Sequence, residues 1–243
     1  MPLPPDAVVR LNLGHIWLSE YPLEIPVHGF LIKHPAGAGL VDTGYGTPLE
    51  LIKDYRPVNA SVAAALRRHD VDPSDIRWVI NSHLHFDHCG QNAVFPQAPL
   101  YVQRAEYERR HRYADTPAAW LEYAGARYEL LDGEREIVPG VRVLTTPGHT
   151  AGHQSIEVDT TDGPALLTGD ACWTVRMFEG EAPREGMMED EAVFGRSLEK
   201  MRQLKPATVH FCHDNRTWRT HSGISTGPIE NAGRSGALNG HHA

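Results

Sequence analysis

The chain has 243 residues, of which 41% are hydrophobic and 22% charged, and its formal net charge at pH 7 is −8. These values exclude a disordered or collagen-like chain and allow one large domain with its own core. The acidic balance argues against a nucleic-acid partner, and the lack of any run of about 18 apolar residues argues against a membrane span.

Cysteine usage and the first residues indicate the compartment. Cys89, Cys172 and Cys212 are odd in number and far apart, so a reducing compartment is expected rather than a disulfide framework. We expect each to be a small buried residue with a free thiol. Residues 1–6 show no basic stretch followed by an apolar core, so no secretory signal is expected and a cytoplasmic location is predicted.

Short apolar runs alternate with helical patterns through the first half of the chain. Residues 34–38 form a turn signal between two such runs, which predicts a hairpin, and Asn59 stands where a helix cap is expected. In chain order the predicted elements are a strand over 8–13, a hairpin of 29–33 and 39–42, a helix over 60–68, strands over 78–81 and 99–103, and helices over 104–113 and 118–128.

The second half returns to β-structure, with strands over 141–145, 154–159 and 165–168. An amphipathic helix over 191–204 and a strand over 208–212 follow. Residues 222–243 are rich in Gly, Ser and Asn without periodicity and are expected to be a loose tail. The prediction is one α/β domain over 1–221, with two β-rich halves between layers of helices.

One short segment carries four potential metal ligands: His83, His85, Asp87 and His88. Alternate residues of an extended loop point the same way, so His83 and His85 can share one ion. Asp87 and His88 begin a predicted helix and point elsewhere, so the segment can serve two adjacent ions. The mixture of nitrogen and oxygen donors suits zinc, with iron or manganese as alternatives. The competing interpretation is a polar loop with surface histidines.

Three further candidates each follow a short apolar strand, as His83 does: His149, Asp170 and His213. Functional groups gather at the carboxyl ends of strands in layered α/β folds, so these loops are expected to meet at one rim. His153, four residues after His149, either supports this site through hydrogen bonds or is structural.

Through this set of residues the sequence resembles the metallo-β-lactamase-fold hydrolases, from about residue 29 to residue 214. The resemblance implies a four-layer αββα sandwich. It also implies that Asp42, in Val41-Asp-Thr-Gly44, is a buried aspartate that accepts a hydrogen bond and orients a ligand loop; a simple turn residue is the alternative. Matched position by position, the resemblance implies that His83, His85 and His149 bind one ion. It implies that Asp87, His88 and His213 bind a second ion and that Asp170 binds both.

Within this superfamily the chain is similar to the quorum-quenching N-acyl-homoserine lactonases, through Ser82-His-Leu-His-Phe-Asp-His88 and Thr145-Thr-Pro-Gly-His-Thr-Ala-Gly-His-Gln-Ser155. True β-lactamases of this fold usually lack a bridging aspartate. Glyoxalase II-like enzymes add a C-terminal helical domain, and RNase Z-like nucleases need a basic surface and an extended arm; neither is expected here.

The resemblance implies a dinuclear hydrolase with two divalent ions, zinc first and iron, manganese or cobalt as alternatives. A hydroxide shared by the ions would open a lactone ring, and Asp87 would pass a proton to the leaving alkoxide. Lactonases often place a tyrosine at the position of Trp173, which is expected to be an apolar wall with one N–H donor, or else a core residue.

The substrate is expected to be a small ester or lactone, with an N-acyl-homoserine lactone first. An esterase or phosphotriesterase of the same fold is the alternative, and a non-catalytic metal-binding protein is a third. A homodimer is left open as the assembly.

Overall fold

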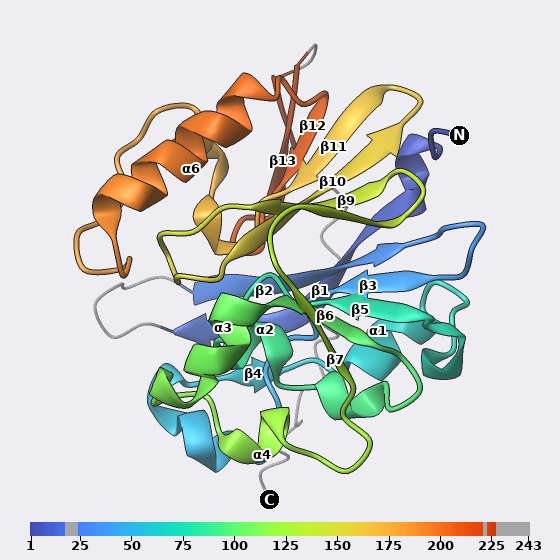
Figure 1. The fold of residues 1–243 in the computed structure, drawn as a ribbon, viewed down its shortest axis with the longest axis vertical. Coiled ribbons are helices and arrows are strands. Elements are labelled where there is room, and N and C mark those ends of the chain that lie inside the picture. The colour runs from blue at the N-terminus through green and yellow to red at the C-terminus, as the bar shows by residue number, and fades with distance from the viewer. Residues whose placement is uncertain (18–23, 221–222, 227–243) are drawn as a thin grey trace, which may run out of the picture.

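The computed structural model describes residues 1–17, 24–220 and 223–226. In this part of the chain two mixed sheets pack face to face, with helices outside each, which is the four-layer αββα arrangement predicted from the sequence (Figure 1). The strands of the first sheet come from the N-terminal half of the chain, and those of the second sheet come from the C-terminal half.

The first sheet has the strand order β4-β1-β2-β3-β5-β6-β7. β1, β2 and β3 pair antiparallel, whereas β3, β5, β6 and β7 run parallel. The strands are β1 (Val8–Trp17), β2 (Glu24–Ile32), β3 (Gly39–Val41), β4 (Val58–Asn59), β5 (Trp78–Ile80), β6 (Leu100–Gln103) and β7 (Tyr128–Leu131).

The second sheet has the strand order β14-β13-β12-β11-β10-β9-β8. Its pairs are antiparallel except β11 with β12, which run parallel. The strands are β8 (Arg135–Val138), β9 (Val141–Thr145), β10 (Gln154–Thr160), β11 (Gly163–Leu167), β12 (Thr208–His210), β13 (Arg216–Arg219) and β14 (Gly223–Thr226).

The helices are short except α6, which lies on the outer face of the second sheet, while α1 to α4 lie beyond the first sheet (Figure 1). The α-helices are α1 (Val62–Arg67), α2 (Phe86–Cys89), α3 (Arg104–Arg109), α4 (Ala118–Leu121), α5 (Val175–Phe178) and α6 (Glu191–Gln203). The 3-10 turns are Pro5–Ala7, Leu49–Tyr55, Pro73–Asp75, Asn92–Val94, Arg110–Arg112 and Gly169–Ala171.

Apolar side chains between the sheets and under the helices hold these elements together. Phe30, Ile80 and Ile156 belong to the layer between the sheets, where the alternating inward side chains of both sheets meet. α6 packs Phe194 and Met201 against the outer face of the second sheet. Burial of apolar side chains of this size stabilises the fold by about 1.5–3 kcal/mol each.

Most predicted elements are confirmed, including the hairpin of β2 and β3 and the long helix α6. The helix expected over 118–128 is wrong beyond Leu121: Glu122 leaves the helical conformation, Gly125 has a φ of +88°, and Tyr128 begins β7. The cap of α1 is Ser61, whose side chain accepts from the backbone N–H of Ala64, and not Asn59. 

The predicted loose tail is wrong for its first described residues, because Gly223–Thr226 form β14 and pair antiparallel with β13. The other residues of 222–243 lie outside the described part of the chain. The seven predicted metal ligands and Asp42 all lie in the segments directly after strands β3, β5, β9, β11 and β12, with Asp87 and His88 in α2 and Asp170 in a 3-10 turn.

Candidate metal centre

The loop after β5 is fixed from behind by Asp42, which follows β3. One carboxylate oxygen of Asp42, Oδ1, accepts the backbone N–H of Ser82 at 2.7 Å. The other, Oδ2, accepts the Ser82 hydroxyl at 2.7 Å and lies 2.8 Å from Nδ1 of His88. The His88 ring therefore carries its proton on Nδ1 and directs the lone pair of Nε2 into the site.

Asp170, at the end of β11, faces two groups of histidines with its two carboxylate oxygens. Oδ1 lies 3.2 Å from Nε2 of His88 and 3.3 Å from Nε2 of His213. Oδ2 lies 3.2 Å from Nε2 of His149 and 3.9 Å from Nε2 of His83. Asp170 thus directs one carboxylate oxygen at each of two groups of histidines.

The possible ligands grouped with Asp170 Oδ1 are His88, His213 and Cys212, whose ligand atoms all lie within 4.8 Å of one another. Asp87 lies beside this group, with Oδ2 3.6 Å from Nε2 of His88 and 3.5 Å from Nε2 of His213. Ligands at about 2.0–2.1 Å from a tetrahedral zinc ion lie about 3.3 Å from one another, close to these separations. The carbonyl of Pro26, 2.8 Å from Nδ1, orients the His213 ring.

The group around Asp170 Oδ2 contains His83, His85 and His149, whose ring nitrogens lie within 4.8 Å of one another. Nε2 of His149 is 3.0 Å from Nδ1 of His85, and the other nitrogen of His149 is 2.9 Å from the carbonyl of Met187. Nδ1 of His83 is 3.0 Å from the Ser82 hydroxyl. All three rings thus direct a nitrogen at the same space.

The donor set would suit a cation, because the site leaves buried polar atoms without partners among the described residues. Nε2 of His83 and Nε2 of His88 are buried and have no hydrogen-bond partner among the described residues. Burial lowers the pKa of His83 well below its ordinary value, so the ring is neutral and its Nε2 is an electron-pair donor. Buried polar atoms of this kind need a partner, and a divalent ion supplies one to each.

His153 lies directly behind Asp170. Its Nε2 accepts the backbone N–H of Asp170 at 2.8 Å, so Nδ1 carries the proton and donates to the Thr146 hydroxyl at 2.9 Å. Thr146 in turn bonds to Ser155 at 2.8 Å, and Ser155 donates to the carbonyl of Thr168 at 2.8 Å. Burial lowers the pKa of His153 to about 3, which keeps it neutral.

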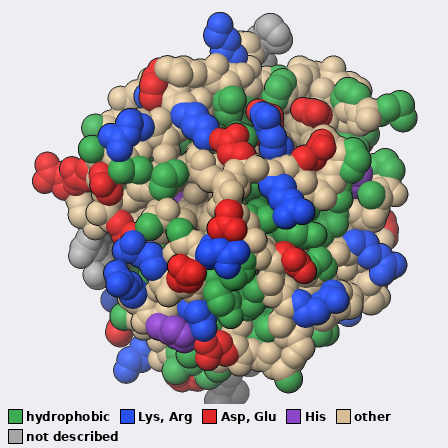
Figure 2. Space-filling model, in the orientation of Figure 1, with side chains coloured by type: hydrophobic (Ala, Val, Ile, Leu, Met, Phe, Trp, Pro, Cys, Tyr) green, Lys and Arg blue, Asp and Glu red, His purple; other side chains and the backbone are tan. Residues whose placement is uncertain are grey.

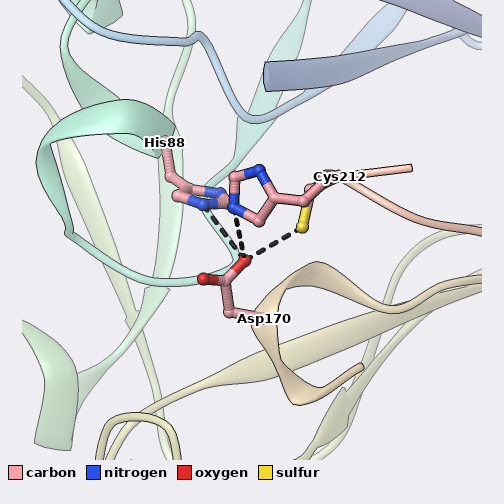
Figure 3. Close-up of side chains that lie close together, drawn as sticks. His88, Asp170 and Cys212 are labelled. Carbon is pink, nitrogen blue, oxygen red and sulfur yellow. Dashed lines mark hydrogen bonds and ion pairs between the residues drawn. The ribbon is translucent and has the colours of Figure 1, made fainter. Parts of the chain in front are cut away.

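Cys212 also contacts the carboxylate of Asp170. Figure 3 shows its thiol and the ring of His88 directed at one oxygen of Asp170. The thiol lies 2.9 Å from Oδ1 of Asp170 and 3.3 Å from the carbonyl of Gly169. Burial, reinforced by the negative charge of Asp170, raises the pKa of this thiol well above its ordinary value, so it is an S–H donor. All three cysteines are buried and free, as expected.

The site opens into a cavity of about 940 Å³. Trp173 stands in its wall, with 8% of its surface exposed and its ring centroid 5.8 Å from that of His149. The same ring packs against Phe194 of α6 at 5.5 Å, so Trp173 belongs both to the wall and to the core beneath it. Other apolar residues line the same cavity, among them Ile25, Phe86, Met177 and Met187.

Charges on the face drawn in Figure 2 do not single out a partner. Figure 2 shows basic and acidic side chains interspersed on the face that is drawn, without a patch of one sign. No helix in the described part of the chain is long and apolar enough to cross a membrane.

Sequence reasoning gave Ser82 and Thr146 no role, and treated Cys212 as a small buried residue beside the predicted ligand His213. Ser82 precedes the histidine motif directly, so its place next to two ligand loops is the signal that could have revealed it. Cys212 directly precedes His213 in the same way. Thr146 carries no such signal, because its role depends on which strand ends meet in three dimensions.

Comparisons with known proteins agree with this geometry. The family model of the metallo-beta-lactamase superfamily matches residues 24–213. An N-acyl homoserine lactonase of a Bacillus species is 36% identical over 212 residues, which cover 79% of this chain and 82% of that protein. The N-acyl homoserine lactonase AttM of Agrobacterium fabrum is 34% identical, with 86% of this chain and 88% of that protein covered.

Solved structures give the same result. The structure of an N-acyl homoserine lactone hydrolase, with the product N-hexanoyl-L-homoserine bound at its catalytic metal centre, matches with a TM-score of 0.77 and 29% identity. The match covers 88% of this chain and 94% of that chain. With most of its length matched by the superfamily model and by these relatives, the chain belongs to the metallo-beta-lactamase superfamily and, within it, to the N-acyl homoserine lactonase family of hydrolases.

Proposed function

We propose that the protein opens the lactone ring of N-acyl-homoserine lactones with the help of two divalent ions. The observation that carries this proposal is the position of Asp170, whose two oxygens face separate groups of histidines at the floor of a cavity. The relatives named as N-acyl homoserine lactonases support the choice of substrate.

Seven residues would hold the ions, which we expect to be zinc: His83, His85 and His149 the first, Asp87, His88 and His213 the second, and Asp170 both. When bound, the ions would supply a Lewis acid for the carbonyl oxygen and an activated water. The protein contributes the fixed orientation of the rings, through Asp42, the carbonyls of Met187 and Pro26, and His153 behind Asp170.

Asp87 is the residue that we assign to proton transfer. Its carboxylate lines the cavity, and its Oδ2 lies between His88 and His213. From this position it can accept a proton during attack and give it to the alkoxide that leaves the opened ring. The neighbouring apolar wall around Trp173 excludes water from the substrate and suits the acyl chain.

The test is a substrate panel on purified protein with its metal content measured. We expect two ions per chain and turnover of an N-acyl-homoserine lactone well above that of a plain aliphatic lactone or a phosphotriester. A higher rate on the phosphotriester would assign the protein to the esterase and phosphotriesterase alternative. Full metal content without turnover on any of the three would contradict catalysis.

We also propose a cytoplasmic location. Its support is that Cys89, Cys172 and Cys212 are all free thiols, as expected in a reducing compartment.

A further inference from the structure

Glu106, the third residue of α3, is a fully buried carboxylate outside the set of proposed ligands. Its Oε1 accepts the backbone N–H of Leu84 at 2.9 Å. Its Oε2 accepts the hydroxyl of Thr150 at 2.7 Å and the backbone N–H of Gly152 at 3.2 Å. One side chain therefore receives three donors from two different loops.

Both loops carry ligands of the same proposed ion. Leu84 lies between His83 and His85, and Thr150 follows His149 directly. The carbonyl of Leu84 also accepts the Thr116 hydroxyl at 3.0 Å, so both backbone polar groups of this residue are fixed. The separation of the loop of His85 from the loop of His149 is thus set through Glu106.

α3 approaches the second loop so closely that only glycine fits there. A Cβ atom on Gly152 would lie 2.2 Å from the backbone nitrogen of Glu106. From the same helix Arg109 pairs with Glu189 at 3.2 Å, and Glu189 accepts the backbone N–H of Ala151 at 3.0 Å. α3 therefore holds residues 150–152 from two sides.

The donors around Glu106 require a carboxylate. Two oxygens without hydrogens can accept from Leu84, Thr150 and Gly152 together. A glutamine side chain would present its NH₂ group to at least one of these N–H or O–H donors and leave it unpaired in the interior. A carboxylate is otherwise costly to bury, and burial raises the pKa of Glu106.

We propose that Glu106 is a positioning residue for the first metal ion, which sets the spacing of His83 and His85 from His149. The proposal rests on the metal-binding part of the proposed function and not on the substrate. Residues that orient metal ligands typically change metal affinity by about 10-fold to 100-fold when they are replaced.

The test uses metal-free protein titrated with Co²⁺ alone, followed by its visible absorption, so it needs no substrate. Wild-type protein is expected to bind two ions. Glu106→Gln should bind one ion as the wild type does and the other at least tenfold more weakly, with loss of the absorption bands of that site. Wild-type protein that binds two ions but opens no lactone would overturn the proposed function and leave this test intact.

Two backgrounds identify the ion that is affected. His213→Ala removes a ligand of the second ion, and in this background Glu106→Gln should weaken the remaining ion at least tenfold. His149→Ala removes a ligand of the first ion, and there Glu106→Gln should leave the remaining affinity unchanged. Equal weakening in both backgrounds, or none in either, overturns the proposal.

A control separates positioning from stability. Val158→Ala leaves a gap between the sheets, four residues along β10 from the end that reaches the site, and should lower Tm without changing Co²⁺ affinity. If Glu106→Gln does not fold, Thr150→Val removes one of the three donors and should weaken the first ion alone by a smaller factor. Co²⁺ binding by Thr150→Val that equals the wild type would overturn the proposal.

Discussion

At the scale of single residues, the direction of each hydrogen bond decides what a histidine can do. His153 accepts from the backbone N–H of Asp170, so its second nitrogen must donate to Thr146. His88 donates to Asp42 and so presents a bare nitrogen to the cavity. Both histidines therefore carry their proton on Nδ1, but Nε2 of His153 already accepts the backbone N–H of Asp170. Of the two, only His88 has a nitrogen free for a cation.

Asp87→Asn should separate catalysis from metal binding. Asparagine keeps one oxygen for the second ion but cannot accept a proton, so kcat is expected to fall by about 100-fold or more while metal content stays near two ions. Steady-state rates and metal analysis of the same preparation test this. Asp115→Asn is the matched control at the cavity, because Asp115 bonds to Tyr55 and not to the histidines. An Asp87→Asn variant that keeps most of the wild-type rate would exclude the proton-transfer role of Asp87.

Trp173→Phe should keep the aromatic wall and remove the indole N–H. If the N–H contacts the substrate, kcat/KM should fall about tenfold, which corresponds to about 1.4 kcal/mol, and Trp173→Tyr should recover the loss. The measurement is kcat/KM on an N-acyl-homoserine lactone, together with Tm. Unchanged kinetics with a lower Tm in both variants would place Trp173 in the core alone, through its contact with Phe194.

At the scale of elements, local signals and tertiary pairing explain which predictions succeeded. The hairpin of β2 and β3 and the amphipathic α6 have strong local patterns, and both were predictable. Residues 118–128 contain good helix formers, but Gly125 adopts positive φ and Tyr128 pairs with Leu100 of β6. That pairing is a long-range contact, and no local pattern reports it.

The predicted metal ligands were easier to find from the sequence than the residues that position their loops. His83, His85, Asp87 and His88 share one motif, so their types and spacing are visible in the sequence. Glu106 stands in a charged helical segment and looks like an ordinary surface residue, because its three donors come from loops distant in sequence.

Gly148→Ala tests how the start of α6 supports the loop of His149. Gly148 has a φ of +131°, and a Cβ atom there would lie 2.4 Å from the backbone of Phe194. We expect the free energy of unfolding to fall by about 3 kcal/mol and the first ion to bind more weakly. Gly180→Ala is the control, since Gly180 also has positive φ but faces open space. If urea unfolding shows the same loss of free energy of unfolding in Gly148→Ala and Gly180→Ala, the effect comes from the positive φ alone.

At the scale of the whole molecule, bound metal should contribute to global stability. An ion present at about 1,000 times its Kd adds about 4 kcal/mol to the free energy of unfolding. Chelation is therefore expected to lower Tm in two steps if the two ions differ in affinity, as measured by calorimetry alongside metal content. Full activity with one ion per chain would contradict the dinuclear site.

Buried neutral histidines should make the metal-free fold sensitive to acid. Burial, with smaller contributions from Arg10 and His213, lowers the pKa of His28 to about 3, whereas an unfolded histidine titrates near about 6.5. Between these values the unfolded chain binds one more proton, so stability falls by about 1.4 kcal/mol for each pH unit of acidification. His28→Gln should flatten the pH dependence by this amount between about pH 6 and about pH 4. If the free energy of unfolding, measured in urea, depends on pH equally in the wild type and in His28→Gln, His28 is protonated in the folded protein.

Neither half of the molecule holds a complete site. His83, His85, Asp87 and His88 follow a strand of the first sheet, whereas His149, Asp170 and His213 follow strands of the second. A complete donor set therefore exists only after His213 has been synthesised and the second sheet has packed on the first. Under the proposed function, the ions would connect the two halves of the chain at the end of the sandwich that carries the site.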